Sequence, residues 1–373
     1  MNSINNRRLA YEVSLDGRGV PCFYKGKRLP RIITNDIWSY LMHHSEKRFK
    51  GDKLKKAMSF IQQAFDFYIA AANPRQSSRP LLYYYAYLNL AKLYLLNCNI
   101  DLPAKMYHGI NDPKINNKSR LHFRSQVISI ENIKSDHSKI FPEILMNCPR
   151  EVDYNLPRTI KVLDLISQIP TIHRTYVNIT GNKPLFCPIG ILRVYKERDR
   201  LWMRIGLEKK DADVRDTIKT INKRRGFKSL FGIIEKNDNI GDGYRFEDYY
   251  IFESKPMSYE PYRIDSALDV LSQKFRKLGV WTIFTNRGYR YYLSGHEPRL
   301  TLPQMCSSYA IMFYLGSITR YKPYDYDKII ARYQWLINDF IETHPPQFLY
   351  ILASTLAGTE VVNPPIPSLR FAK

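Results

Sequence analysis

The sequence of 373 residues is poor in glycine, cysteine and long apolar runs, and each shortage excludes a class of protein. Only 17 glycines, with no low-complexity segment, exclude a fibrous or largely disordered chain. The five cysteines lie far apart and form no CxxC pair, which argues against a zinc ribbon or a disulfide scaffold and favours buried thiols. No apolar run reaches the roughly 18 residues that cross a bilayer, and Met1 to Tyr11 lacks the apolar core of a secretory signal. We therefore expect a cytoplasmic protein with no membrane partner.

Familiar catalytic motifs are missing as well. The chain has neither a GxxxxGK[ST] phosphate loop nor a GxGxxG fingerprint, so nucleotide hydrolysis by those devices is excluded. HExxH, EF-hand and GxSxG patterns are also absent. The sequence therefore predicts no cofactor, apart from a divalent metal ion if the nuclease alternative described below holds.

Acidic residues are scarce beside the basic ones, because 57 Lys and Arg face 35 Asp and Glu and leave a net charge of +22. A charge this large repels itself in the compact state and attracts polyanions. The basic residues recur in clusters along the chain, which indicates a folded basic surface rather than a charged tail. We expect nucleic acid, DNA or RNA, as the partner. A protein partner with an acidic face, a larger assembly, or a basic surface without a specific ligand are the alternatives.

Apolar periodicity predicts helices near both ends of the chain. Apolar residues recur at helical spacing over residues 37–42, 54–72, 81–96, 303–320 and 326–342. The stretch 81–96 is apolar almost all round, so it belongs in the middle of a bundle. Its tyrosines are therefore expected to pack in the core: Tyr83, Tyr84, Tyr85 and Tyr87.

The middle of the chain has a different texture. Short β-branched and aromatic runs predict strands over residues 127–130, 189–195, 201–207, 249–252 and 281–285. Helical stretches lie between them, so the fold class is α+β. The helical N- and C-terminal regions are expected to pack together around a mixed α/β middle region. Four regions follow: a basic N-terminal extension (1–30), a helical region (31–120), a mixed α+β region (121–300) and a C-terminal helical region (301–373).

Two strings resemble signatures of the YaaC-like family of bacterial proteins. The first runs from Ser78 to Lys92 and on to His108-Gly109. The second is Leu302-Pro303 followed by Met312 to Pro323. The resemblance spans about residues 37–362, and it implies this architecture with the basic lead as an addition. The resemblance implies no reaction, since the family has no established reaction.

The helices around Tyr83 and His108 are also similar to HEPN-type helical domains, some of which are ribonucleases while others only bind nucleic acids or partners. Catalytic members need an arginine and a following histidine with about four to six residues between them, so that the cation stabilises the phosphate while the imidazole moves a proton. No arginine stands at that spacing before His108. By analogy, this resemblance implies a place in a bacterial antiviral defence or mobile-element system.

Two patterns elsewhere could carry nuclease chemistry. Arg290 and His296 have five residues between them, the spacing that the HEPN pattern requires. Asp242, Glu253 and Lys255 fit a metal-dependent nuclease, in which carboxylates hold a divalent ion and a lysine orients the attacking water. Both patterns are short enough to arise by chance. A phosphate-attracting loop and a surface salt bridge are the respective alternatives.

Two basic segments are the candidates for contact with nucleic acid. They combine cations with aromatic rings or with a glycine that lets the backbone approach a phosphate. The candidate residues are Lys223, Arg224, Arg225, Lys228, Arg287, Tyr289 and Arg290. Tyrosines that face the core and solvated arginines are the alternative. The sequence thus favours a non-enzymatic nucleic-acid-binding or complex-forming protein. A nuclease and a pure protein-protein interaction subunit are the other two hypotheses.

Overall fold

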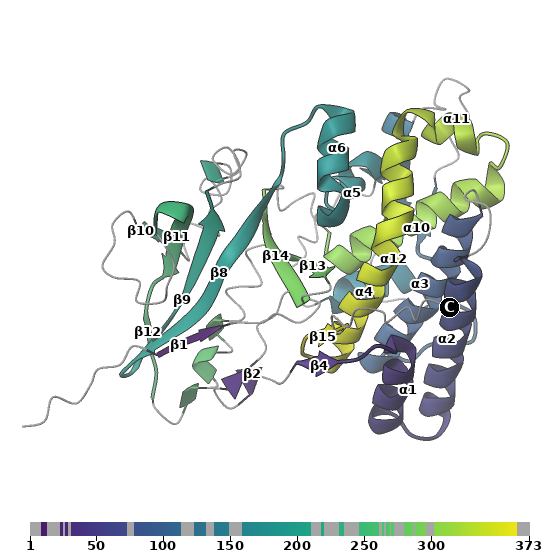
Figure 1. Ribbon diagram of the computed structural model, residues 1–373. Helices are drawn as coiled ribbons and strands as arrows, with labels where there is room; N and C mark the ends of the chain where they lie inside the picture. Colours follow the sequence, from purple (N-terminus) through teal and green to yellow (C-terminus); the bar gives the residue numbers. More distant parts are fainter. Residues whose placement is uncertain are drawn as a thin grey trace, which may run out of the picture.

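The computed structural model describes most of the chain (Figure 1). The described residues are 9–12, 23–24, 27–28, 31–72, 78–112, 123–131, 138–148, 159–209, 218–219, 231–234, 246–260, 263–264, 266–268, 270–271, 280–285, 288–295 and 302–363. Helices gather on one side of the molecule and a large antiparallel sheet on the other, which confirms the predicted α+β class. None of the described helices combines the length and apolar composition that a membrane-spanning helix needs.

The helical half is built from segments at both ends of the sequence. Its helices are α1 (Ile37–Arg48), α2 (Gly51–Ala70), α3 (Arg79–Asn97), α4 (Ile140–Asn147), α5 (Val162–Ile166), α6 (His173–Thr180), α10 (Gln304–Tyr321), α11 (Tyr326–Ile330) and α12 (Gln334–Ala357). The side chain of Asp36 caps α1 by accepting from the backbone N–H groups of Trp38 and Ser39. Pro80 stands in the first turn of α3, where its missing N–H is not needed.

Helix α3 forms the centre of this half, as its all-round apolar character predicts. Tyr83, Tyr84 and Tyr87 are buried, and the ring of Tyr87 stacks on Phe348 of α12 with 3.8 Å between the centroids. Helix α10 packs beside α3 at Gly316, where an added Cβ would lie 3.1 Å from the Cβ of Tyr84. The two ends of the chain are joined further by the parallel pairing of β4 (Ile32–Ile33) with β15 (Val361–Val362). The predicted packing of the terminal helical regions is therefore confirmed.

The large sheet has the strand order β10-β11-β9-β8-β14-β13. In addition, β1 pairs with β8, and β12 pairs with β9. Its strands are β1 (Leu9–Glu12), β8 (Phe186–Glu197), β9 (Arg200–Glu208), β10 (Phe231–Ile234), β11 (Tyr249–Ser254), β12 (Met257–Ser258), β13 (Val280–Thr285) and β14 (Gly288–Ser294). All of these pairs are antiparallel. Part of the basic N-terminal lead thus contributes a strand to the sheet.

The sheet meets the helical half at its edge strand β13. The side-chain amide of Gln304 on α10 accepts from the backbone N–H of Thr282 at 3.0 Å and donates to its carbonyl at 2.6 Å. The side-chain amide of Gln347 on α12 likewise accepts from the backbone N–H of Phe284 at 2.6 Å and donates to its carbonyl at 2.7 Å. The ring of Phe284 also stacks on Tyr350 at 4.0 Å. An edge that would otherwise present unpaired backbone groups is covered by two helices.

Smaller elements complete the fold. A three-stranded sheet consists of β5 (Ile110–Asn111), β6 (Val127–Ile130) and β7 (Thr159–Lys161), and a two-stranded one of β2 (Phe23–Tyr24) and β3 (Lys27–Arg28). The cysteines among the described residues are free thiols. Cys148 and Cys306 are distant in sequence, yet their sulfur atoms lie 3.8 Å apart where α4 ends against α10.

Candidate functional site

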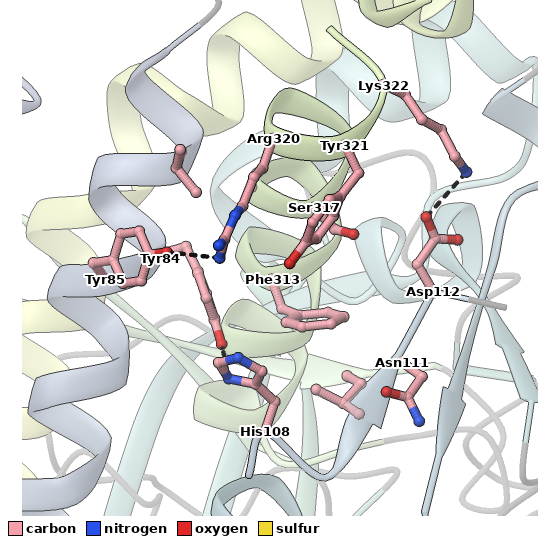
Figure 2. Close-up of a pocket in the computed structure, with 13 residues that line it drawn as sticks. Tyr84, Tyr85, His108, Asn111, Asp112, Phe313, Ser317, Arg320, Tyr321 and Lys322 are labelled. Atoms are coloured by element: carbon pink, nitrogen blue, oxygen red, sulfur yellow. Dashed lines mark hydrogen bonds and ion pairs between the residues drawn. The ribbon is translucent and has the colours of Figure 1, made fainter. Parts of the chain in front are cut away.

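A pocket of about 460 Å³ opens between α3 and α10 and is closed by the segment that leads into β5. Figure 2 shows its polar lining, which comes from three separate parts of the chain. Its polar lining residues include Tyr84, Tyr85, His108, Asp112, Arg320 and Lys322. The volume lies within the range of about 300–1,000 Å³ that is typical of small-molecule sites.

His108 lies at one side of the pocket and contacts Tyr84. The hydroxyl of Tyr84 forms a hydrogen bond with Nδ1 of His108, and it lies 3.5 Å from the hydroxyl of Tyr309. Partial burial, followed by the positive charges of Lys92 and Arg320, lowers the pKa of His108. Burial raises the pKa of the Tyr84 phenol. At neutral pH, His108 is therefore a neutral imidazole with one donor and one acceptor nitrogen.

The backbone at Gly109 fixes the position of His108. Gly109 has φ +69°, a left-handed conformation that side chains with a Cβ rarely adopt. An added Cβ would lie 2.4 Å from Cδ of Pro142 on α4. The chain therefore passes close over α4 at this residue and directs the histidine toward α3.

Arg320 supplies the main positive charge of the pocket. Its Nη1 donates to the hydroxyl of Tyr85 at 3.1 Å, and its guanidinium lies 5.0 Å from the ring centroid of Tyr321. No carboxylate in the described part of the chain forms an ion pair with Arg320. Lys322 differs, because its Nζ pairs with Asp112 at 3.1 Å (Figure 2). The one acidic group of the pocket is thus neutralised locally, and Arg320 remains available to an anion.

The arrangement can hold an anion next to a flat ring. A guanidinium binds phosphate or carboxylate oxygens through paired N–H groups. Tyrosine rings beside it offer faces on which a base can stack. Across the described ranges, no group of three or more His, Cys, Asp or Glu side chains is arranged to hold a metal ion.

Most of the residues that the sequence proposed as site residues lie outside the described residues: Lys223, Arg224, Arg225, Lys228, Asp242, Arg287 and His296. Arg290 is exposed on β14, opposite Ile283 of β13, and Tyr289 lies on the same strand opposite Phe284. Their neighbours Tyr291 and Tyr292 pack against the two different hydrophobic clusters of the molecule. The nucleic-acid contacts and the Arg290-His296 pair therefore stay predictions.

Glu253 and Lys255 lie at the end of β11, and the carboxylate of Glu253 has a partner. Nε of Arg204 on β9 donates to Oε1 of Glu253 at 2.6 Å, and the two residues are opposite each other in the sheet. Arg204 is buried and lies 4.5 Å from the ring centroid of Tyr195. Lys255 is exposed beyond the strand. The structure thus gives Glu253 a partner in the sheet, and the metal-binding set with Asp242 stays a prediction.

Replacing Glu253 by alanine is expected to lower the free energy of unfolding by about 2 kcal/mol, because the Arg204 guanidinium would be left buried and unpaired. Lys255→Ala is the matched control and should change stability by less than about 0.5 kcal/mol, since that side chain is exposed. Urea unfolding of both variants measures the difference. Equal stabilities would show that the ion pair does not support the sheet.

Sequence reasoning missed the pocket for a physical reason. No arginine stands near His108 in the sequence at the spacing of the HEPN pattern, whereas the fold brings Arg320 of α10 into the same pocket. The apolar helix predicts Tyr84 in the core, and Tyr84 is buried, but its hydroxyl also contacts His108 in the pocket lining. One signal was present: both strings that resemble the YaaC-like signatures contain residues that line this pocket.

A comparison with known families gives one match. The model of the YaaC-like protein family aligns with residues 23–356. Neither curated proteins nor solved structures give a match, and the HEPN-like resemblance stays a prediction. The aligned span covers most of the chain and contains every residue that lines the pocket. This protein therefore belongs to the YaaC-like family.

Proposed function

We propose that this protein binds nucleic acid without catalysis, and that the pocket between α3 and α10 takes one phosphate-bearing nucleotide unit. The observation that carries the proposal is Arg320, a guanidinium with no acidic partner among the described residues, which stands in a tyrosine-walled pocket. The chain around it has a net charge of +22, which attracts a polyanion from a distance.

The shape and chemistry of the pocket favour a nucleotide over an acidic protein segment. A cavity of about 460 Å³ has room for a single small group rather than for a protein surface. Arg320 suits a phosphate, and the rings of Tyr85 and Tyr321 suit a base. A glutamate or aspartate side chain of a protein partner could pair with Arg320 but has no ring to stack on these tyrosines.

Removing the Arg320 charge is the direct test. Arg320→Ala is expected to weaken binding to labelled single-stranded and double-stranded DNA and RNA by about ten-fold, because the contact is charge-assisted. Arg332→Ala is the matched control, since it removes an equal charge from an exposed position of the same helical half, outside the pocket. Binding is measured by fluorescence anisotropy across a salt series, and the affinity should fall steeply with salt.

Two outcomes would contradict the proposal. Equal weakening by the two substitutions would mean that binding depends on diffuse charge and not on the pocket. Absence of binding at moderate salt would leave the basic surface to an acidic protein partner.

A nuclease is the second candidate, and one observation favours it. His108 and Arg320 line the same pocket although they come from distant parts of the sequence. A neutral imidazole can transfer a proton while a guanidinium stabilises a developing phosphate charge. The strands from the binding experiment, incubated with magnesium, are therefore checked for cleavage. Cleavage that His108→Gln abolishes while binding persists would replace the non-enzymatic proposal, and intact strands would support it.

A further inference from the structure

Three exposed tyrosines either line the pocket or lie one or two residues along the chain from a residue that lines it. Tyr107 precedes His108, and Tyr321 and Tyr324 stand at and just beyond the end of α10. Their exposed fractions are 50%, 67% and 84%. The other large apolar side chains that are exposed in the described ranges include no tyrosine. The exposed aromatic side chains in the described part of the helical half are thus these three tyrosines, which belong to the two segments that line the pocket with α3, and Trp335 of α12.

Each of the three rings is accompanied by a cation. The Nζ of Lys105 lies 5.4 Å from the ring centroid of Tyr107. The guanidinium of Arg320 lies 5.0 Å from that of Tyr321, and the Nζ of Lys328 lies 4.4 Å from that of Tyr324. A ring beside a cation matches the repeating unit of a nucleic-acid strand, which is a base beside a phosphate.

We propose that the pocket and these three tyrosines form a site for single-stranded nucleic acid, and that duplexes are poor ligands. One nucleotide enters the pocket at Arg320, and bases on either side stack on Tyr107 and on the pair Tyr321 and Tyr324. This inference rests on the proposed function and specifies the class of nucleic acid that the site selects.

The expected preference for single strands over duplexes follows from the accessibility of the bases. In a duplex the bases stack on one another and face their partners, so exposed tyrosines can reach only the backbone. In a single strand each base has free faces, and stacking on aromatic side chains tolerates any sequence. The cations beside the rings would attract both forms through their phosphates. Selection of single strands therefore depends on the rings, and attraction depends on the cations.

The first arm of the test uses the full-length wild-type protein and three DNA probes of one length. These are a single-stranded oligothymidylate of about 12 nucleotides, which is within the usual site sizes, its duplex with oligodeoxyadenylate, and a strand in which abasic sites replace the bases. The single strand is expected to bind at least ten-fold more tightly than either of the others. Equal affinity for the duplex or for the abasic strand would overturn the inference.

The second arm replaces the rings and leaves the cations in place. The double variant Tyr321→Leu, Tyr324→Leu is expected to bind the single strand at least ten-fold more weakly, because two stacking faces are lost. The double variant Tyr321→Phe, Tyr324→Phe is the matched control, and it should bind as the wild type does. Both side chains are largely exposed, so the substitutions leave the core untouched.

The two proposals fail in different ways. If the leucine variant binds like the wild type while Arg320→Ala weakens binding, the stacking inference is wrong and the nucleic-acid-binding proposal stands. If the wild-type protein binds none of the three probes and none of the RNA strands used to test Arg320→Ala, both fail. A loss in the leucine variant together with the preference for a strand that carries bases establishes the single-stranded site.

Discussion

Lowering the pH from 7 to 4 is expected to reduce the free energy of unfolding by about 3 kcal/mol through one side chain, His344. This histidine lies in α12 and is fully buried. Its Nε2 lies 2.6 Å from the hydroxyl oxygen of Ser308, which donates to the carbonyl of Gln304 at 2.7 Å. Its Nδ1 has no hydrogen-bond partner in the described part of the chain. Burial lowers the pKa of His344 to about 3.

The direction of the effect follows from proton binding. The unfolded chain takes up a proton at His344 as the pH falls below its ordinary value of about 6.5, whereas the folded chain excludes that proton until about pH 3. The unfolded state therefore binds more protons in this range, and stability falls as the pH decreases. Above pH 6.5 both states are neutral at this position, and His344 contributes no pH dependence.

Urea unfolding of the wild type and of His344→Gln at pH 7, 6, 5 and 4 measures this contribution. The glutamine variant is expected to be less stable at pH 7 but to lose less stability on acidification. His43→Gln serves as the matched control, because it removes a histidine that is exposed on α1. Other groups titrate in this range as well, so the difference between the profiles is the readout. Parallel profiles for the wild type and His344→Gln would contradict the prediction.

Gly109→Ala is expected to lower the free energy of unfolding by about 3 kcal/mol. A residue with a Cβ pays roughly 1–2 kcal/mol for the left-handed backbone that φ +69° requires. The new methyl group would also meet Cδ of Pro142 at 2.4 Å and Cβ of Lys139 at 3.1 Å, and overpacking of this kind adds about 1–3 kcal/mol. Because Gly109 follows His108, the same substitution should displace the imidazole from Tyr84 and weaken ligand binding.

Gly181→Ala provides a matched control for the backbone term. Gly181 ends α6 with φ +71°, and no heavy atom lies within 4 Å of its added Cβ. Only the roughly 1–2 kcal/mol of the left-handed conformation should appear there. Thermal unfolding compares the two variants. Equal losses would show that the contact between Gly109 and Pro142 is not tight.

Helices were predictable wherever local chemistry decided them. The apolar stretches 54–72, 81–96 and 303–320 correspond to α2, α3 and α10 within a few residues. The sequence predicts the last helix over 326–342. In the structure the α-helix is interrupted after α11, and α12 then runs through Pro345 and Pro346 to Ala357. Local rules end a helix before two prolines. The extensive burial of the segment after them, which includes Phe348 and Leu352, overrides that local preference.

The positions of strands in the sequence were predictable, but the pairing between strands was not. The runs 201–207 and 249–252 correspond to β9 and β11, as their β-branched and aromatic residues predict. Their antiparallel register places Arg204 opposite Glu253, a pairing that a short acidic-x-lysine pattern does not reveal. The cation beside Glu253 comes from a strand about 50 residues earlier in the sequence, so the short pattern cannot show it, and the metal-binding hypothesis stays a prediction.

The sequence by itself determined the charge of the protein, its α+β class and the two strings that mark its family, because these depend on composition and on local periodicity. Only the tertiary structure decided the site. Gly316 lets α10 pack closely against α3, and Gly109 turns the chain over α4, so that Arg320, Tyr84 and His108 line one pocket. Such contacts depend on the packing of helices that are more than 200 residues apart in the sequence. No local pattern encodes that geometry.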